Sequence, residues 1–263
     1  MGSATREAEH AAVAALRALG AVDQLTGEQL LAATLVVDTS PQLRAALSDD
    51  TAESASREGI VRSVFGGYTP AAQSVLTTLS TSRWSSEADF VSAIEQLGIR
   101  ALAASAPKTI SIDNELFAFS AAVASNSQLE LALGSRLGAS KGKVALVRDL
   151  LQGKASAQTL AILSALIGQP RGRRVAELVR YAAAIVADES GFTIATITVA
   201  TELSAKQTTR LASALSTRYG ANIRINEIVD PTILGGMRVQ IGDAVIDGSI
   251  ANRITDLRLR LAS

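Results

Sequence analysis

The stretch "GFTIATITVA" (191–200) decides the fold class, because it separates two kinds of sequence. It begins at a glycine and is rich in the β-branched residues Thr, Ile and Val, and such runs favour β-strands. Residues 1–190 before it are dominated by alanine and leucine at helical spacing. After it, short β-branched runs alternate with further helical patterns. The sequence therefore predicts an α+β multidomain protein, in which all-α helical bundles precede a small α/β domain.

The first part of the chain predicts a series of helices joined by short connections. "REAEHAAVAALRALG" (6–20) has one apolar face and ends at Gly20. "TGEQLLAATLVVDTS" (26–40) predicts a second helix, with Thr26 as its N-cap. Short connections are typical of helical bundles. Further helical stretches, divided by small polar residues or glycines, are predicted at 41–48, 53–65, 70–80 and 87–105.

An internal repeat divides this helical part into two. "SPQLRAAL" (40–47) resembles "NSQLELAL" (126–133), and "IVRSVFGG" (60–67) resembles "LVRDLLQG" (146–153). The interval is the same in both pairs (126 − 40 = 86). Generic similarity between Ala/Leu-rich helices is the alternative explanation. We predict two tandem copies of one helical module, at 1–106 and 107–190, because a solenoid needs three or more repeats.

The last part, 191–263, predicts the order β-α-β-β-β-α. After the first strand, Ser204 and Gln207 fit a capping box that opens a helix, and Gly220 ends it. "NIRINEIV", "GMRVQIG" and "AVI" predict three more strands, and helical spacing returns from Ile250 to Leu261. This part is therefore expected to form a small α/β domain.

The segment "GGMRVQIGDAVIDGS" (235–249) has the composition of a binding loop, but its spacing favours turns. A phosphate loop opens a helix and usually carries a lysine, whereas these glycines lead into a strand. A calcium loop needs four or more oxygen ligands close together, whereas Asp243 and Asp247 lie at opposite ends of a short strand. We expect positive φ at the glycines, a two-residue hairpin turn at Gly242-Asp243, and a helix cap at Asp247 or Ser249. The predicted turn and cap residues are Asp230, Gly235, Gly236, Gly242, Asp243, Asp247, Gly248 and Ser249.

Composition argues against several classes of function. Basic and acidic residues balance at 25 each, and cysteine is absent, which excludes disulfides and thiolate chemistry. The single histidine, His10, lies in a polar segment, and "PRGRR" (170–174) is interpreted as a solvated turn. No catalytic, cofactor-binding or metal-binding residues and no nucleic-acid partner are predicted. The apolar runs are shorter than the ~20 residues of a membrane span, so a soluble protein is expected.

The C-terminal sequence resembles a known family. "VDPTILGGMRVQIGDAVIDGSIANRITDLRLRL" (229–261) is similar to the C-terminal signature of the delta subunit of F-type ATP synthase, a family that includes the mitochondrial oligomycin-sensitivity-conferring protein. The family pattern has a Val/Ile-Asp pair, a Gly-rich strand entry, an Ile-Gly-Asp turn and Val-Ile-Asp-Gly-Ser. The resemblance covers roughly residues 110–263. Large actinobacterial forms of the subunit look similar in carrying an extra N-terminal module.

The resemblance implies a non-catalytic subunit of the peripheral stalk that needs no cofactor. In that family the helical domain holds N-terminal helices of the alpha subunits, the C-terminal domain engages the end of the b subunit, and the assembly resists the torque of the rotor. The resemblance further implies one copy in a hetero-oligomeric complex, peripheral to the cytoplasmic face of a bacterial plasma membrane.

The resemblance also points to a partner-binding groove between the first and fifth helices of a bundle. An Arg-Tyr-Ala run usually marks the first helix of the family, and "SATREAEHAAVAAL" stands in its place. Either copy can therefore supply the groove, and ordinary bundle core is the alternative role of these positions. The candidates are Leu16, Leu19, Val75, Leu76 and Leu79 in the first copy and Leu160 and Leu163 in the second.

Two other hypotheses compete with a stator subunit. One is a free-standing helical adaptor or scaffold with an α/β tail that serves unrelated partners. The other is an enzyme that uses the Gly/Asp stretch at 235–249.

Overall fold

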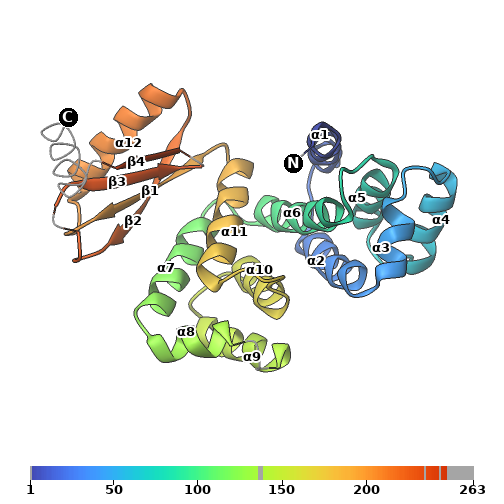
Figure 1. Ribbon diagram of the computed structural model, residues 1–263, viewed down its shortest axis with the longest axis horizontal. Coiled ribbons are helices and arrows are strands. Elements are labelled where there is room, and N and C mark those ends of the chain that lie inside the picture. Colours follow the sequence, from blue (N-terminus) through green and yellow to red (C-terminus); the bar gives the residue numbers. More distant parts are fainter. Residues whose placement is uncertain (1, 136–138, 234, 243, 248–263) are drawn as a thin grey trace, which may run out of the picture. The chain divides into compact units, whose positions relative to one another are not determined.

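The computed structural model describes residues 2–135, 139–233, 235–242 and 244–247. Most of the described chain is helical, and a small mixed sheet lies in its C-terminal part, which confirms the α+β class (Figure 1). Contacts divide the chain into two compact units, Met1–Val186 and Ala187–Ser263. The further division of the first unit at residue 106 remains a prediction.

The first unit begins with six helices, and four of them, α2, α3, α5 and α6, begin at a side-chain N-cap. Side chains of Ser40, Thr69 and Ser86 each accept a hydrogen bond from a backbone N–H in the first turn of the helix that follows. The predicted ranges are confirmed to within three residues at each end. The helices are α1 Ser3–Ala18, α2 Gln24–Thr39, α3 Pro41–Ser48, α4 Ser54–Val64, α5 Pro70–Thr81 and α6 Glu87–Ser105.

One predicted cap is wrong. Thr26 does not cap α2, because the helix already begins at Gln24 and the backbone N–H of Thr26 donates to the carboxylate of Asp23 at 2.9 Å. Asp23 is therefore the N-cap. The Thr26 side chain is buried, and its hydroxyl lies 2.8 Å from that of Thr69, so that it links α2 to the start of α5 instead.

A hydrophobic core joins these six helices. Leu16 of α1, Leu30 of α2, Leu79 of α5 and Phe90 of α6 all belong to it and are almost fully buried. Trp84 closes this core between α5 and α6, and its indole N–H donates to the carbonyl of Leu79 at 2.8 Å. The single tryptophan is thus an anchor of the first bundle.

The crossing of α2 and α6 is unusually close because glycines stand on both helices. A Cβ atom on Gly27 of α2 would lie 2.8 Å from the backbone nitrogen of Leu102 in α6. Reciprocally, a Cβ on Gly98 of α6 would lie 3.0 Å from the backbone nitrogen of Leu31 in α2. The first distance is shorter than real Cβ contacts and the second is tighter than nine in ten of them, so a larger residue at either position requires its neighbours to shift.

Five further helices complete the first unit, and α6 lies between them and α1–α5 (Figure 1). All residues from Leu97 to Leu102 in α6 are buried, and burial all around a helix requires neighbours on every side. Helix α11 runs across the division between the units. The bounds are α7 Ile112–Ala124, α8 Ser127–Gly134, α9 Ser140–Leu151, α10 Ala157–Gly168 and α11 Val175–Glu189.

One polar contact occurs in both halves of the helical unit. The side chain of Gln29 in α2 accepts a hydrogen bond from the backbone N–H of Thr69, the N-cap of α5, at 2.7 Å. The side chain of Glu115 in α7 likewise accepts from the backbone N–H of Ser156, the N-cap of α10, at 3.0 Å. Glu115 follows Gln29 at the interval of the sequence repeat (115 − 29 = 86). The same structural role at the same interval supports a duplicated module.

The second unit contains a four-stranded sheet in the order β2-β1-β3-β4, with α12 packed on one face (Figure 1). Strand β1 pairs in parallel with β2 and antiparallel with β3, and β3 and β4 form the predicted hairpin. The predicted capping box of Ser204 and Gln207 is confirmed, as is the left-handed Gly220 at the end of α12. The bounds are β1 Thr193–Val199, α12 Ala205–Tyr219, β2 Ile223–Val229, β3 Met237–Ile241 and β4 Ala244–Asp247.

Several predictions at the C-terminus lie outside the described residues. They concern the last helix, from Ile250 to Leu261, together with Asp243, Gly248 and Ser249. Asp247 itself is the last residue of strand β4.

The close crossing of α2 and α6 generates a test of stability. Gly27→Ala is expected to lower the free energy of unfolding by about 1–3 kcal/mol, because the new methyl group meets the backbone of Leu102. Gly59→Ala in α4 is the matched control, because its Cβ meets nothing within 4 Å. Without a clash, alanine is favoured over glycine in a helix by about 0.5–1 kcal/mol. Urea denaturation measures both. Equal stability of the two variants would contradict the close crossing.

Candidate partner-binding surfaces

The first copy's candidate residues lie mostly inside the chain's own core. Leu16, Val75, Leu76 and Leu79 are no more than 2% exposed, where α1 packs against α5 and α6. Leu19, the C-cap of α1, is 38% exposed. In the described structure the four buried residues act as bundle core, which was the alternative role, and Leu19 alone among the five presents a substantial apolar surface.

Polar contacts fix the start of α1 on α6. The hydroxyl of Thr5 donates to the carboxylate of Asp89 at 2.8 Å and accepts from the backbone N–H of Ser85 at 3.1 Å. Burial raises the pKa of Glu9 above the usual range for glutamate, and the negative charge of Asp89 adds to the shift. These contacts hold α1 in place, so its outward face is a fixed surface. That face carries the exposed residues Ala11 and Ala14.

The second copy's candidates lie on α10. Leu163 is fully buried and Leu160 is half-buried. Helix α10 packs against α9, α7 and α6, and it also contacts α2 from the first copy. A partner helix could therefore reach Leu160 but not Leu163 unless the chain's own helices moved. The partner roles of Leu19 and Leu160 remain predictions.

The Gly/Asp stretch forms turns in the described residues. Gly235, Gly236 and Gly242 have φ angles of 119°, 83° and 54°, which side chains with a Cβ rarely adopt. The carboxylate of Asp230 accepts from both the hydroxyl and the backbone N–H of Thr232, at 2.6 and 2.9 Å. The hydroxyl contact and then the N–H contact lower the pKa of Asp230. These contacts are those of a structural Asx turn.

Two further features are absent from the described ranges. Within them, no group of three or more His, Asp or Glu residues is placed to hold a metal ion. Over the same residues, no helix combines the length and the apolar character that crossing a membrane requires.

The interpretation of "PRGRR" (170–174) as a solvated turn is wrong, because its arginines bind a buried carboxylate. Glu95 of α6 has a side chain only 5% exposed, and Arg171 and Arg173 approach its two oxygens at 2.8 and 2.9 Å. The guanidinium of Arg173 also lies 4.9 Å from the centre of the Tyr181 ring. Arg171 has a φ of 46°, a strained value for a residue other than glycine.

This ion-pair cluster could have been found from one signal in the sequence. A lone glutamate in the apolar run "FVSAIEQLGI" (90–99) must be paired if that helix is buried on every side. Nearby, Gln169 donates to the carboxylate of Asp38, at the end of α2, at 2.6 Å. The loop between α10 and α11 is thereby tied to both α2 and α6.

An open hollow beside the cluster has balanced charge. Its volume is about 610 Å³, and three of the side chains lining it are arginines. Arg44 is held by Glu87 at 2.8 Å, and the other two arginines are those bound to Glu95. The three arginines are matched by three carboxylates, those of Glu87, Glu95 and Asp38, so the hollow has no excess positive charge to attract an anion.

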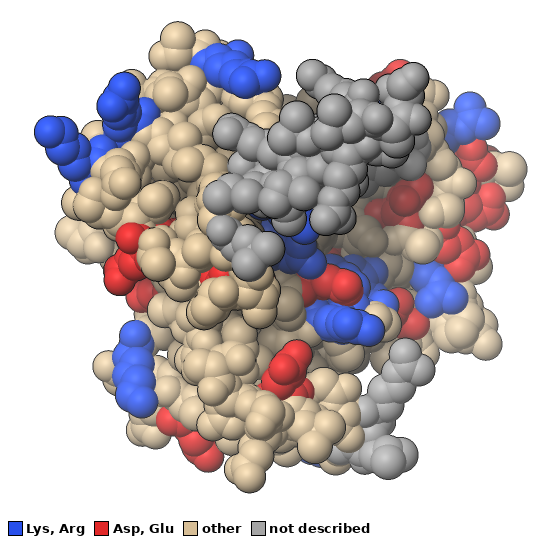
Figure 2. Space-filling view, turned by 60° about the vertical axis from the view of Figure 1, so that its left-hand side comes forward, with Lys and Arg blue, Asp and Glu red and all other residues tan. Residues whose placement is uncertain are grey.

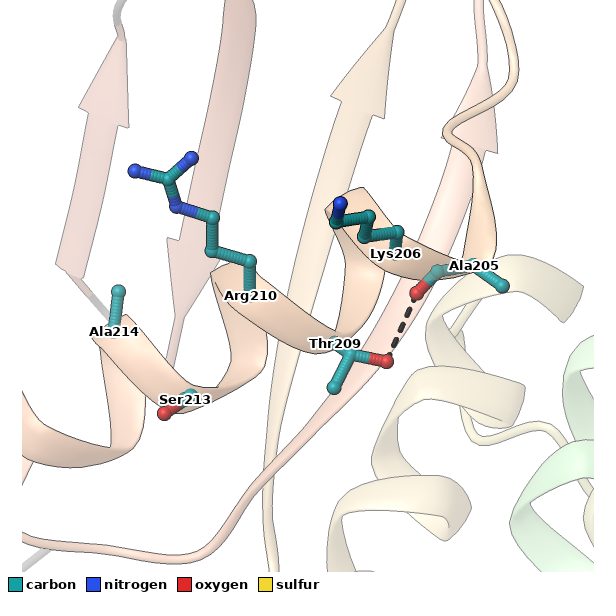
Figure 3. A pocket seen from close by; sticks show the side chains of 6 residues that line it. All are labelled: Ala205, Lys206, Thr209, Arg210, Ser213 and Ala214. Carbon is teal, nitrogen blue, oxygen red and sulfur yellow. Dashed lines mark hydrogen bonds between the residues drawn. The ribbon is translucent and has the colours of Figure 1, made fainter.

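The charge of helix α12 is not balanced, because the helix carries basic residues and no acidic one. Lys206 and Arg210, one turn apart, line a shallow open hollow of about 720 Å³ together with Ala205, Ser213 and Ala214. Figure 3 shows the two cationic side chains extending from the outer side of the helix, while Thr209 bonds back to the carbonyl of Ala205. Among the described residues neither cation has a carboxylate partner. This surface suits a partner with acidic residues.

Elsewhere, charges of both signs are interspersed. On the face in Figure 2, described Lys and Arg residues alternate with Asp and Glu over the molecule. A nucleic-acid binder instead concentrates basic residues in one patch or stripe. The distribution on this face therefore does not favour nucleic acid as a partner.

The Glu95 cluster generates a second test of stability. Glu95→Gln is expected to lower the free energy of unfolding by on the order of 3 kcal/mol, because it leaves two partly buried arginines without their counter-charge. Asp50→Asn is the control: it removes an equally short ion pair to Arg83, whose side chain is 79% exposed. Such exposed pairs contribute less than about 1 kcal/mol. Equal losses in thermal or urea unfolding would show that the Glu95 pairs are no stronger than a surface contact.

Comparisons with known proteins identify the family. The sequence model described as ATP synthase delta (OSCP) subunit matches residues 99–261. The ATP synthase subunit delta of Leifsonia xyli subsp. xyli is 51% identical over 263 residues, covering 100% of both chains. That of Kineococcus radiotolerans is 38% identical over 251 residues, covering 94% of this chain and 91% of the relative.

A chain in the structure of the Toxoplasma gondii mitochondrial ATP synthase hexamer is 21% identical, with a TM-score of 0.39. The match covers 64% of this chain and 97% of the Toxoplasma chain. The assignment rests on the sequence relatives and not on this likeness. On their evidence, the chain belongs to the ATP synthase delta (OSCP) subunit family.

Proposed function

We propose that this chain is the delta subunit in the peripheral stalk of an F-type, proton-translocating ATP synthase. In this role it links the catalytic head to the b-subunit stalk and holds the head against the torque of the rotor. The observation that carries the proposal is the full-length match to a relative named ATP synthase subunit delta. The chain then occurs once per complex, peripheral to the cytoplasmic face of the bacterial plasma membrane.

The helical unit is proposed to hold N-terminal helices of alpha subunits. Two tandem modules of the same design support this role, because the paired caps of Gln29–Thr69 and Glu115–Ser156 position the fifth helix of each module in the same way. Binding would occur by packing of an amphipathic helix against the module. Each apolar anchor that such a helix buries contributes roughly 1.5–3 kcal/mol.

The C-terminal unit is proposed to engage the end of the b subunit through the outer face of α12. Lys206 and Arg210 are unpaired among the described residues, and no acidic residue of α12 opposes them. An acidic segment of b would supply the missing counter-charges. Charge complementarity of this kind fixes the register of a partner and speeds its association.

A non-catalytic role agrees with the family, and the Gly/Asp stretch serves the fold. Asp230 and the glycines at 235, 236 and 242 form turns. The family membership favours a stator subunit over a free-standing adaptor, because the similarity covers the helical part as well as the α/β part.

The stator role is tested by reconstitution. The purified chain is expected to hydrolyse no ATP, and to restore proton-driven ATP synthesis when it is added to delta-depleted membranes and catalytic heads. A peptide of the alpha-subunit N-terminus should bind the free chain at micromolar concentration. Turnover of ATP by the chain alone, or no binding of the peptide, would contradict the proposed function.

The α12 contact is tested by charge reversal. Lys206→Glu combined with Arg210→Glu is expected to weaken binding of the cytoplasmic part of b at least about tenfold, a change of about 1.4 kcal/mol. The loss should shrink at high salt, because exposed charges are screened. Arg62→Glu, an exposed position of α4 in the helical unit, is the matched control and should leave b binding unchanged. Unchanged affinity of the double variant would place the b contact elsewhere.

A further inference from the structure

The two helical modules share one helix. Helices α8 and α9 begin at Ser127 and Ser140, each 86 residues after α3 and α4 begin at Pro41 and Ser54. Helix α10 follows α5 at almost the same interval. Since α1 precedes α2 in the first module, the helix that precedes α7 in the second is α6. Helix α6 is therefore the last helix of the first module and also takes the place of the first helix in the second, so the two modules overlap at α6 instead of meeting at residue 106.

This arrangement defines two equivalent seams. The first seam is the line of contact between α1 and α5, and the second seam is the line of contact between α6 and α10. Both pairs of helices are in contact. In the proposed function such a seam, between the first and fifth helices of a module, receives an alpha-subunit helix.

A helix of this chain already lies against the second seam. Helix α2, which belongs to the first module, contacts both α6 and α10. It meets α6 at the two glycines of the close crossing, and its Leu31 is only 6% exposed. Its C-terminal end is tied to the end of α10 by the hydrogen bond from Gln169 to Asp38.

The repeat separates the residues of α2 that belong to the common core from those that face α6. Leu30 and Val37 of α2 have buried counterparts in α7, at Leu116 and Val123, and these positions form the core that both modules have in common. Gly27, which faces α6, is instead replaced by Asp113 in α7. A carboxylate at that position excludes the close approach that glycine allows.

Two other positions of α2 show the same difference between residues that face α6 and residues of the common core. Leu31 faces α6, and its counterpart at the repeat interval is Phe117. Ala33, part of the first core, corresponds to the buried Phe119, so a core position remains apolar in both modules. The positions of α2 that face α6 thus carry residues that its counterpart α7 does not share, whereas the core positions are apolar in both helices.

From these contacts we infer that α2 is an internal occupant of the second seam. The inference rests on the proposed function, since it concerns the seams that receive alpha-subunit helices. The second seam is covered by the chain itself, so the first seam, at whose end Leu19 is 38% exposed, is the one left for an external helix. One chain therefore binds one alpha N-terminal helix in this way.

The inference is tested by the number of peptides bound and by their position. Calorimetric titration of the full chain with an alpha N-terminal peptide should give one peptide per chain. A photo-reactive group on the peptide should label α1 or α5 and not α10. Two peptides per chain, or labelling of α10, would overturn the inference and leave the proposed function standing. No binding at all would overturn the proposed function, and the inference with it.

A covalent link between α2 and α10 provides a second test. The chain has no cysteine, so Asp38→Cys with Gln169→Cys introduces two thiols that a short bis-maleimide cross-linker can join, which holds α2 on α10. The cross-linked and unlinked forms are expected to bind the same single peptide with affinities within about twofold. A loss of one bound peptide on cross-linking would show that α2 leaves the second seam to admit a partner, and would overturn the inference. Comparison of both forms of one preparation controls for the two substitutions.

Discussion

The close crossing of α2 and α6 is the contact on which the helical unit depends. Gly27 and Gly98 let the two backbones approach until each helix touches the main chain of the other. At this distance α6 is buried along its whole middle section, and it serves the helices on both of its sides. A helix buried all round keeps its position only while every neighbour is present. This arrangement agrees with the chain up to Val186 forming one compact unit.

The buried charge of Glu95 adds specificity to this packing. A carboxylate in an apolar helix is costly unless it is fully paired, and here two arginines from the loop between α10 and α11 approach its two oxygens. Apolar side chains alone would accept several rotations of α10 against α6. A single carboxylate with two partners selects one of them. The rigidity that a stator needs thus comes from a glycine contact and an ion-pair cluster at the same shared helix.

Much of the fold follows from the sequence, because helix ends and turns are local. Pro41, Pro70, the capping box at Ser204 and the glycines at 220 and 242 each specify their conformation without distant partners. Contacts between remote segments were not predictable in this way. Five of the seven proposed groove residues are core, because helical spacing identifies a buried face but not what covers it. The pairing of Glu95 with Arg171 and Arg173, nearly eighty residues away, likewise depends on the fold.

A structure of this chain within an assembled ATP synthase tests the central claim most directly. The account predicts one alpha-subunit N-terminal helix packed against α1 and α5, with α2 still seated on α6 and α10. An alpha helix lying against α10 in the place of α2, or a head attached without any contact to the helical unit, would contradict it.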